Sequence, residues 1–328
     1  MTNLRKTTIL AILGAITILL SACSNDKAEQ VHFLRFERLI FKTKPSDLQH
    51  EMLKHRDEYN TELIVFYPED EQYMQMVTEF VSDPVMHDVF LITDSVFSDM
   101  SNIEKELGRA LHRAYTLYPE MPRIKRFYTM VTGQFDNYPY RIFSNISEIC
   151  ISLDQYALQY MESYGYFGTP KYIVQLCSQQ QIVPDCIRFI AQLNIQWPET
   201  DQTLLDYAIA EGKAIYFAEQ TMPHLHDTTL LRYTGEQLNW MRHNTRNVWQ
   251  WLIENKLLYS TDNNLFHNII DDAPKTNAFG DGSAPRTTDY IGWQIVRAYA
   301  KKTGCTIEEL FKEDDSQKIL NISGWRPK

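Results

Sequence analysis

Apolar residues recur at helical spacing through most of the chain. Residues 103–117, 244–258 and 290–302 each place apolar side chains three or four positions apart, which predicts helices with one face toward a core. A further helix is predicted to begin near Thr203 and to run past Tyr216. Helix is therefore expected to dominate the second half of the chain.

Four tetrapeptides carry a signal for the start of a helix. In each, a Ser or Thr hydroxyl and a Glu or Gln three residues later can satisfy backbone N–H groups of the first turn. These tetrapeptides are residues 46–49, 101–104, 234–237 and 306–309. They predict at least four helices, and Gly304 is placed to end the helix over residues 290–302.

Strand patterns are confined to the first half. Residues 31–41 nearly alternate apolar and charged side chains, whereas residues 124–134 and 146–153 carry β-branched and aromatic runs beside turn residues. Residues 271–285 are predicted to form a long loop. The expected fold class is α+β and helix-dominated, with a small sheet in the first half and packed helices in the second.

The chain begins with an export signal. Arg5 and Lys6 precede the apolar residues 9–20, a run too short to span a bilayer, which ends in Leu20-Ser21-Ala22-Cys23. A cysteine directly after such a cleavage site is typical of bacterial lipoproteins, in which the thiol is acylated with palmitate-type chains. We therefore expect lipid attachment at Cys23 and firm membrane binding, since each buried methylene contributes about 0.8 kcal/mol. The alternative is a cleaved secretory signal followed by a chance cysteine.

Three segments follow from this prediction. Residues 1–22 form the signal peptide, residues 23–30 a lipid-anchored tether and residues 31–328 a single globular domain. The formal net charge of −10 becomes more negative when the signal is removed, which argues against nucleic acid as a partner and against direct contact with anionic headgroups. Because Ser24, and not aspartate, follows the cysteine, we expect the outer membrane, with the body in the periplasm or on the cell surface.

Four further cysteines have no metal-binding or redox spacing. Cys177 and Cys186 are the nearest pair, and the sequence leaves open whether they form a disulfide or whether all four remain thiols. The four are Cys150, Cys177, Cys186 and Cys305.

Two histidine pairs are candidate metal ligands. His50 and His55 are five residues apart, so a regular helix turns their rings about 140° from each other, too far to share one ion. His224 and His226 form an H-x-H that can offer two rings from an extended loop, but no third ligand is evident nearby. We expect no resident cofactor.

Glu211 is the most suggestive single residue. It precedes Gly212 inside a predicted helix, and an interior glycine, which costs a helix about 1 kcal/mol relative to alanine, suggests that another element approaches closely. The alternative is an ordinary acidic residue on an amphipathic helix. Signatures of a serine nucleophile or of a phosphate-binding loop are absent from the sequence.

Several blocks in the last third resemble the gliding-motility lipoprotein family of Bacteroidetes, the GldB type. The resemblance extends over most of the mature chain, although residues 275–284 depart from the family pattern. The matching blocks are residues 204–206, 211–217 (EGKAIYF), 233–240 (YTGEQLNW), 249–261 (WQWLIENKLLYST) and 290–299 (YIGWQIVRAY).

The resemblance implies a zincin-like fold, because the family is similar to putative zinc peptidases. In those enzymes an H-E-x-x-H helix supplies two zinc ligands and a later glutamate the third. Glu211 matches that glutamate, but the preceding helix, expected near residues 182–192, reads IVPDCIRFIAQ without a histidine. Glu211 is thus expected to be a vestigial ligand position in a pseudo-peptidase.

The resulting hypothesis is a non-enzymatic, lipid-anchored envelope protein that supports gliding motility or the associated secretion machinery by binding envelope proteins. The rival is a zinc-dependent metallopeptidase with a non-standard site formed by Glu211, His224 and His226. A cleft near Trp249, Trp251 and Tyr259 could hold a peptide, and a helix core explains the same rings.

Overall fold

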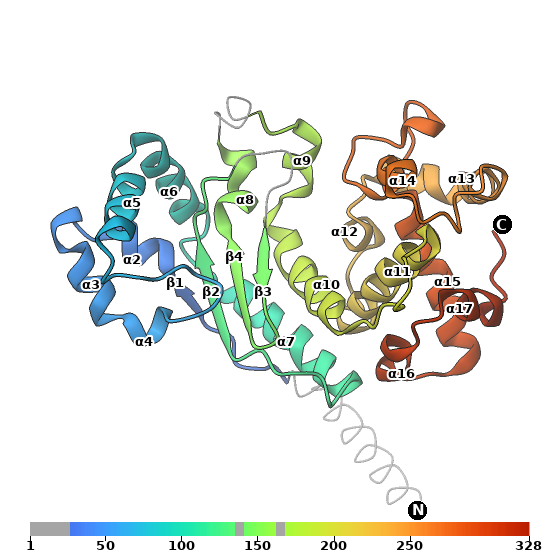
Figure 1. The fold of residues 1–328 in the computed structure, drawn as a ribbon, viewed down its shortest axis with the longest axis horizontal. Helices are drawn as coiled ribbons and strands as arrows, with labels where there is room; N and C mark the ends of the chain where they lie inside the picture. Colours follow the sequence, from blue (N-terminus) through green and yellow to red (C-terminus); the bar gives the residue numbers. More distant parts are fainter. Residues whose placement is uncertain (1–26, 135–140, 162–167, 328) are drawn as a thin grey trace, which may run out of the picture.

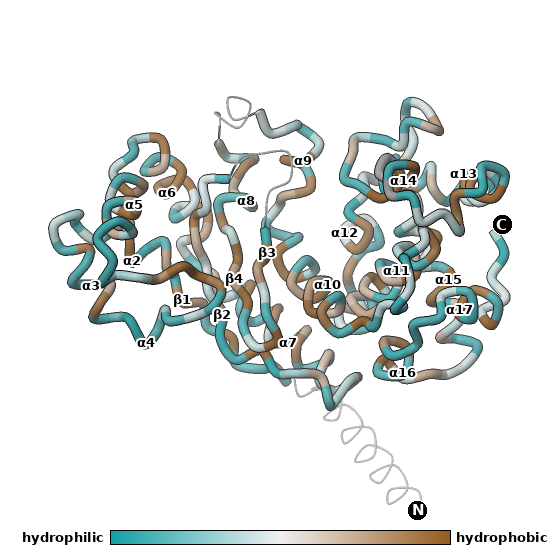
Figure 2. The backbone as a smooth tube through the Cα atoms, viewed as in Figure 1, coloured by the Kyte–Doolittle hydropathy of each residue, from teal (hydrophilic) through white to brown (hydrophobic). Residues whose placement is uncertain are grey.

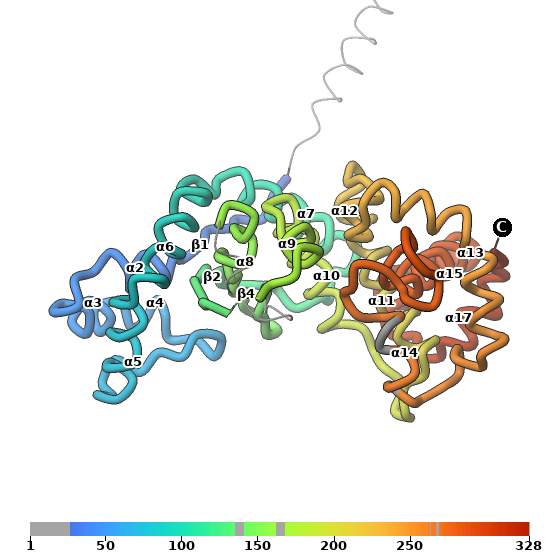
Figure 3. The backbone as a smooth tube through the Cα atoms, turned by 90° about the horizontal axis from the view of Figure 1, so that it is seen from above, coloured from blue at the N-terminus to red at the C-terminus, as the bar shows by residue number. Residues whose placement is uncertain are grey.

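The computed structural model describes residues 27–134, 141–161 and 168–327. The predicted signal peptide and Cys23 lie outside the described residues. A central sheet separates two groups of helices, one formed by residues 36–96 and the other by residues 182–323 (Figure 1). A view from above shows the same order along the long axis: the first group of helices, the sheet and the second group (Figure 3).

The first half contains the sheet and the helices around it. Its strands and helices are β1 (Phe33–Arg35), α2 (Phe36–Lys42), η1 (Pro45–Asp47), α3 (Leu48–Lys54), α4 (Arg56–Tyr59), α5 (Glu71–Ser82), α6 (Pro84–Val96), α7 (Ser101–Leu117), β2 (Arg126–Met130), β3 (Ile142–Ser144), β4 (Glu148–Ser152), α8 (Leu153–Ala157), η2 (Leu158–Tyr160) and α9 (Lys171–Leu176).

The described part of the second half has no strands. Its elements are η4 (Gln179–Gln181), α10 (Ile182–Asn194), α11 (Leu204–Thr221), α12 (Asp227–Leu231), α13 (Gly235–Glu254), α14 (Asn263–Ile270), η5 (Asn277–Phe279), α15 (Thr287–Thr303), α16 (Ile307–Lys312) and α17 (Ser316–Ser323). The expected helix-dominated α+β fold, with a small sheet in the first half, is confirmed.

The sheet has the strand order β1-β2-β4-β3, with β3 antiparallel to β4 and the other pairs parallel. Alternation along the strands sends side chains to two different cores. Phe127 and Ile149 are paired in register and face the large core shared with the second half, whereas Tyr128 and Cys150 face a smaller core under α2–α5. Figure 2 shows apolar residues along these central strands and on α10.

Two of the three predicted strands are confirmed, and the third is largely wrong. β2 and β4 lie inside the predicted ranges, but of residues 31–41 only Phe33–Arg35 forms a strand. The chain then becomes α2, because Phe36 and Ile40, four residues apart, are both buried in the smaller core. The short strand β3 was not predicted.

Two of the four predicted capping boxes are confirmed. Capping boxes form at Thr234 and Thr306, as predicted. Ser101 is the first helical residue of α7, not its cap, and the predicted box at residues 46–49 does not form because η1 occupies that position. A box between Thr203 and Asp206 was missed because its third-position residue is aspartate.

Two of the predicted helical patterns have different outcomes. α15 ends at Gly304, whose φ of 67° is left-handed, so the predicted terminator is confirmed. The helix predicted from residue 244 begins earlier, at Gly235, and continues to Glu254.

α11 and α15 cross with their backbones in contact. A Cβ added at Gly212 would lie 2.3 Å from the carbonyl carbon of Gly292, and one at Gly292 would lie 1.7 Å from the carbonyl oxygen of Ala208. Real Cβ atoms do not reach such distances, so only glycine fits at either position. The close approach predicted from Gly212 is therefore present, and its partner is a second glycine.

The start of the described chain is fixed against α7. The backbone N–H of Glu29 donates to the carbonyl oxygen of Gly108 at 2.9 Å, and a Cβ at Gly108 would lie 2.3 Å from the Glu29 carbonyl oxygen. The Glu29 carboxylate also lies 3.2 Å from His112 and 3.5 Å from Arg123. Among the described residues, no helix combines the length and apolar character needed to cross a membrane.

We predict that Gly292→Ala lowers the free energy of unfolding by about 3 kcal/mol or prevents folding, because the new methyl group would overlap the Ala208 carbonyl. Urea unfolding followed by circular dichroism measures the change. Gly235→Ala is the matched control, since nothing lies within 4 Å of a Cβ there. Equal effects at the two glycines would contradict the backbone contact.

Candidate functional site

Glu211 lies in the middle of α11, where this helix packs against α10. Its Oε2 accepts a hydrogen bond from Arg188 Nη2 at 2.7 Å, and its Oε1 accepts one from Gln192 Nε2. Arg188 and Gln192 are four residues apart on α10, so both project from one face of that helix. Both carboxylate oxygens of Glu211 are thus engaged by α10.

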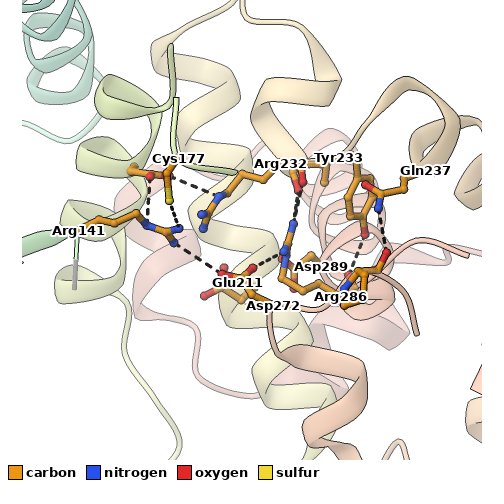
Figure 4. A network of polar contacts seen from close by, with 12 residues as sticks. Arg141, Cys177, Glu211, Arg232, Tyr233, Gln237, Asp272, Arg286 and Asp289 are labelled. Atoms are coloured by element: carbon orange, nitrogen blue, oxygen red, sulfur yellow. Dashed lines mark hydrogen bonds and ion pairs between the residues drawn. The ribbon is translucent and has the colours of Figure 1, made fainter. Parts of the chain in front are cut away.

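A cavity of about 430 Å³ opens beside this pair. We call it the arginine cavity, because four arginines from separate segments line it: Arg141 before β3, Arg188 on α10, Arg232 after α12 and Arg286 before α15. Figure 4 shows several of these side chains converging. Five carboxyl groups also line it, those of Asp185, Glu211, Asp271, Asp272 and Asp289.

Arg286 is the most fully bonded of the four arginines. Its Nη1 binds Asp272, and its Nη2 donates to the carbonyl oxygens of Leu231 and Arg232, each at 3.0 Å. Tyr233 donates to the Arg286 carbonyl oxygen at 2.9 Å. Arg232 and Arg286 both have left-handed backbones, with φ of 57° and 44°, a conformation that costs free energy in a non-glycine residue. The bonds between the two segments offset that cost.

Asp185 forms ion pairs with the two remaining arginines of the cavity, Arg141 and Arg232. Its carboxylate accepts a hydrogen bond from the Tyr156 hydroxyl at 2.8 Å and lies 3.8 Å from Nε of both Arg141 and Arg232. A separation of 3.8 Å gives an ion pair without a hydrogen bond. Arg141 also donates to the Cys177 sulfur at 3.5 Å.

Burial and neighbouring charges shift the pKa values of two carboxyl groups of the cavity in opposite directions. Burial, reinforced by the Glu211 carboxylate, raises the pKa of Asp289 to about 7 although Arg286 and Arg188 oppose the change. Burial acts in the same direction on Asp272, but Arg286, Arg232 and the other arginines hold its pKa below the ordinary value. Asp272 is therefore ionised at neutral pH, whereas Asp289 exchanges a proton there.

Several buried arginine nitrogens of the cavity have no hydrogen-bond acceptor among the described residues. None of the oxygens of the five lining carboxyl groups is buried without a hydrogen-bond partner. The hydroxyl of Thr288 is unpaired as well, but the other unsatisfied groups of the cavity are arginine donors, so the site is short of acceptors. The nitrogens are Arg188 Nη1, Arg232 Nε, Arg232 Nη2 and Arg286 Nε.

The structure keeps His224 and His226 away from the arginine cavity, which they do not line. His226 instead caps α12, where its Nδ1 accepts a hydrogen bond from the Thr228 backbone N–H at 3.2 Å. His55 lies near Glu51 and Glu58 at a different part of the surface. Within the described ranges, no three His, Cys, Asp or Glu side chains are grouped so as to hold a metal ion.

The aromatic residues named from the sequence do not line the arginine cavity either. Trp249 packs edge-on against Trp325, and Trp251 packs against Phe279, each at 5.2 Å between ring centres. Both tryptophans are partly buried against the large core, which agrees with the core explanation. Tyr259 is 55% exposed.

The four described cysteines are free thiols, so the structure contains no bridge between Cys177 and Cys186. Both of these thiols are buried, and burial raises the pKa of each above its ordinary value. Buried, protonated thiols are poor nucleophiles, and they act here as packing residues.

Sequence reasoning identified Glu211 but missed the arginines around it. One signal was present: Arg188 is the only cationic residue in the largely apolar stretch IVPDCIRFIAQ, which forms most of the helix α10. A charge in such a stretch requires a partner. The other three arginines lie in turns or beside predicted loops, where sequence gives no indication that they converge.

Comparison with known proteins shows the family of the chain. The family model described as gliding motility protein GldB matches residues 21–327. No curated protein and no solved structure matches the chain.

We predict that Asp289 makes stability depend on pH. The folded state holds its proton up to about pH 7, whereas the ordinary value is 3.8, so between these values the folded state binds one proton more than the unfolded state. The free energy of unfolding should therefore fall as pH rises through this window, by up to about 1.4 kcal/mol per pH unit, with no further loss from this group above it.

Urea unfolding across that pH range measures the slope, and Asp289→Asn should make it shallower. Asp281→Asn serves as control, because Asp281 is 95% exposed and lies in a loop. A slope that is the same in the wild type and in Asp289→Asn would show that the carboxyl group titrates normally.

Proposed function

The chain belongs to the gliding motility protein GldB family, and from that membership we propose that it is a lipid-anchored envelope protein that supports gliding motility, or the associated secretion machinery, by binding other proteins and without catalysing a reaction. The outer membrane is the proposed location, with Cys23 as the point of lipid attachment.

The pairing of Arg188 with Glu211 carries the non-enzymatic part of the proposal. A catalytic zinc ion needs about three protein ligands with free lone pairs and an open position for water. Glu211 instead uses both oxygens to accept hydrogen bonds from α10, and one donor is a guanidinium at 2.7 Å. A divalent cation at that carboxylate would be repelled by the arginine.

The helix that faces Glu211 supports the same conclusion. In a zincin-like arrangement α10 would supply two histidines and a general base, but this helix contains none of these residues and presents Arg188 and Gln192 to Glu211. The salt bridge stabilises the packing of α10 against α11 in place of a metal. We therefore propose a peptidase-like body whose metal chemistry has been replaced by an ion pair.

Protein binding is proposed because the lining of the arginine cavity has the features of a recognition site. The arginine cavity combines buried cations, ionised and protonated carboxyl groups and apolar side chains such as Phe189 and Ile270. Such mixed lining gives orientation through the polar groups and affinity through the apolar ones.

We predict that Cys23→Ser abolishes incorporation of labelled palmitate and leaves the signal uncut, because the thiol is the proposed point of acylation. Palmitate labelling and gel mobility measure the two effects, and globomycin should reproduce the processing defect. Cys305→Ser, which changes a cysteine of the described body, should leave both unchanged. Wild-type palmitate incorporation and processing in Cys23→Ser would rule out the anchor.

We also predict that the purified full-length protein carries only substoichiometric zinc and that a chelator leaves its melting temperature unchanged, since Glu211 is held by Arg188 and Gln192. Elemental analysis and thermal unfolding measure these quantities. Stoichiometric zinc that is lost in both Glu211→Ala and His226→Ala, but kept in His243→Ala, would establish the metallopeptidase alternative instead.

A further inference from the structure

The four arginines of the arginine cavity are costly to bring together. They come from four segments separated in sequence, and the side chains of Arg188, Arg232 and Arg286 are 11%, 10% and 6% exposed. Like charges repel one another, and burial removes the water that would otherwise solvate each guanidinium. Such a cluster persists only where anions compensate it.

The carboxylates of the protein compensate the cluster unevenly. Arg286 and Arg188 each form a hydrogen-bonded ion pair, with Asp272 and Glu211 respectively. Arg232 does not: within the described part of the chain, its nearest carboxylate oxygen, on Asp185, is 3.8 Å from Nε, and both Nε and Nη2 lack a hydrogen-bond acceptor. Burial without such a bond lowers the pKa of Arg232, whereas the pKa of Arg188 is raised by its partners.

Asp185 cannot satisfy Arg232 without releasing other groups. Its carboxylate already accepts a hydrogen bond from Tyr156 and is shared with Arg141 at 3.8 Å. Arg141 in turn shares Asp272 at 3.7 Å with Arg286. Two carboxylates are thus divided among three guanidiniums, and Arg232 is the guanidinium left with two unpaired nitrogens.

We propose that the arginine cavity binds a carboxylate of a ligand, with the guanidinium of Arg232 as its principal partner and Arg141 as the second. This assignment names the chemistry of the bound partner and rests on the proposed binding function. A guanidinium presents two parallel N–H groups that match the two oxygens of a carboxylate.

The remainder of the cavity indicates an organic ligand in preference to a small inorganic anion. Ile142, Phe189, Tyr207 and Ile270 contribute apolar surface to the lining, and about 430 Å³ lies within the range of small-ligand sites. A carboxylate with an apolar side group therefore fits, whether it is the carboxyl end of a protein or a free acid.

The test uses the full-length protein in detergent and isothermal titration calorimetry. N-acetyl-L-phenylalanine is the probe, and its amide is the matched neutral control. We expect the acid to bind at least tenfold more tightly than the amide. Succinate and a tripeptide with a free carboxyl-terminal phenylalanine distinguish the two sources: tighter binding of the tripeptide indicates a protein end, whereas tighter binding of succinate indicates a small free acid.

Two variants locate the binding. Arg232→Gln should weaken binding of the acid at least tenfold, whereas Arg242→Gln, which removes a surface arginine that is 53% exposed and paired with Asp227, should leave it unchanged. Circular dichroism establishes that each variant is folded. Arg141→Gln provides an independent second variant, expected to weaken the acid and not the amide.

Equal binding of acid and amide, no binding of any carboxylate at millimolar concentration, or equal effects of Arg232→Gln and Arg242→Gln would each overturn the assignment. These failures are separable from failure of the proposed function. The protein could be membrane-anchored, free of zinc and crosslinked to envelope proteins in cells, and yet bind no carboxylate. That result would support the proposed function and contradict only the assignment of this site.

Discussion

The contact between the backbones of α11 and α15 is the constraint on which the rest of the second half depends. Gly212 and Gly292 let the two helices approach until main-chain atoms touch. Glu211 immediately precedes the first glycine, and Asp289 lies one turn before the second, so the same crossing brings both carboxyl groups to the arginine cavity. A larger residue at either glycine would separate them, which couples the packing of the helices to the chemistry of the cavity.

Charge compensation organises this cavity. Arginine cannot lose its proton under ordinary conditions, so each buried guanidinium requires a negative partner nearby. Asp272 is held ionised in this way, whereas Asp289, deeper and next to Glu211, is driven toward its neutral form. Glu211 serves the same compensation, because it pairs with Arg188 across the contact between α10 and α11.

Much of the fold was readable from the sequence, because its helices have strong local signals. The apolar spacing over residues 290–302, Gly304 and the capping boxes at Thr234 and Thr306 all correspond to observed features. The failures occurred where tertiary contacts override local pattern: Phe36 and Ile40 enter a core that selects helix over strand, and β3 exists only because β4 provides a partner.

The site was less readable than the fold. Glu211 and the glycine beside it were found, because an interior helical glycine is unusual. The sequence did not indicate the other arginines of the cavity, Arg141, Arg232 and Arg286. Their positions depend on turns that are distant in sequence and, for Arg232 and Arg286, on left-handed backbone conformations that no local pattern predicts. Asp289 illustrates the same limit, because only its burial beside Glu211 distinguishes it from any other aspartate.

If lipid is attached at Cys23, as proposed, the hydrogen bond between Glu29 and Gly108 has a geometric consequence. Only a few residues separate the two points, and an extended chain spans at most about 3.6 Å per residue. With so short a tether, the end of the molecule near α7 would stay close to the bilayer. Rotation about the membrane normal would remain free but tumbling would not, and the membrane would limit the directions from which a partner can approach.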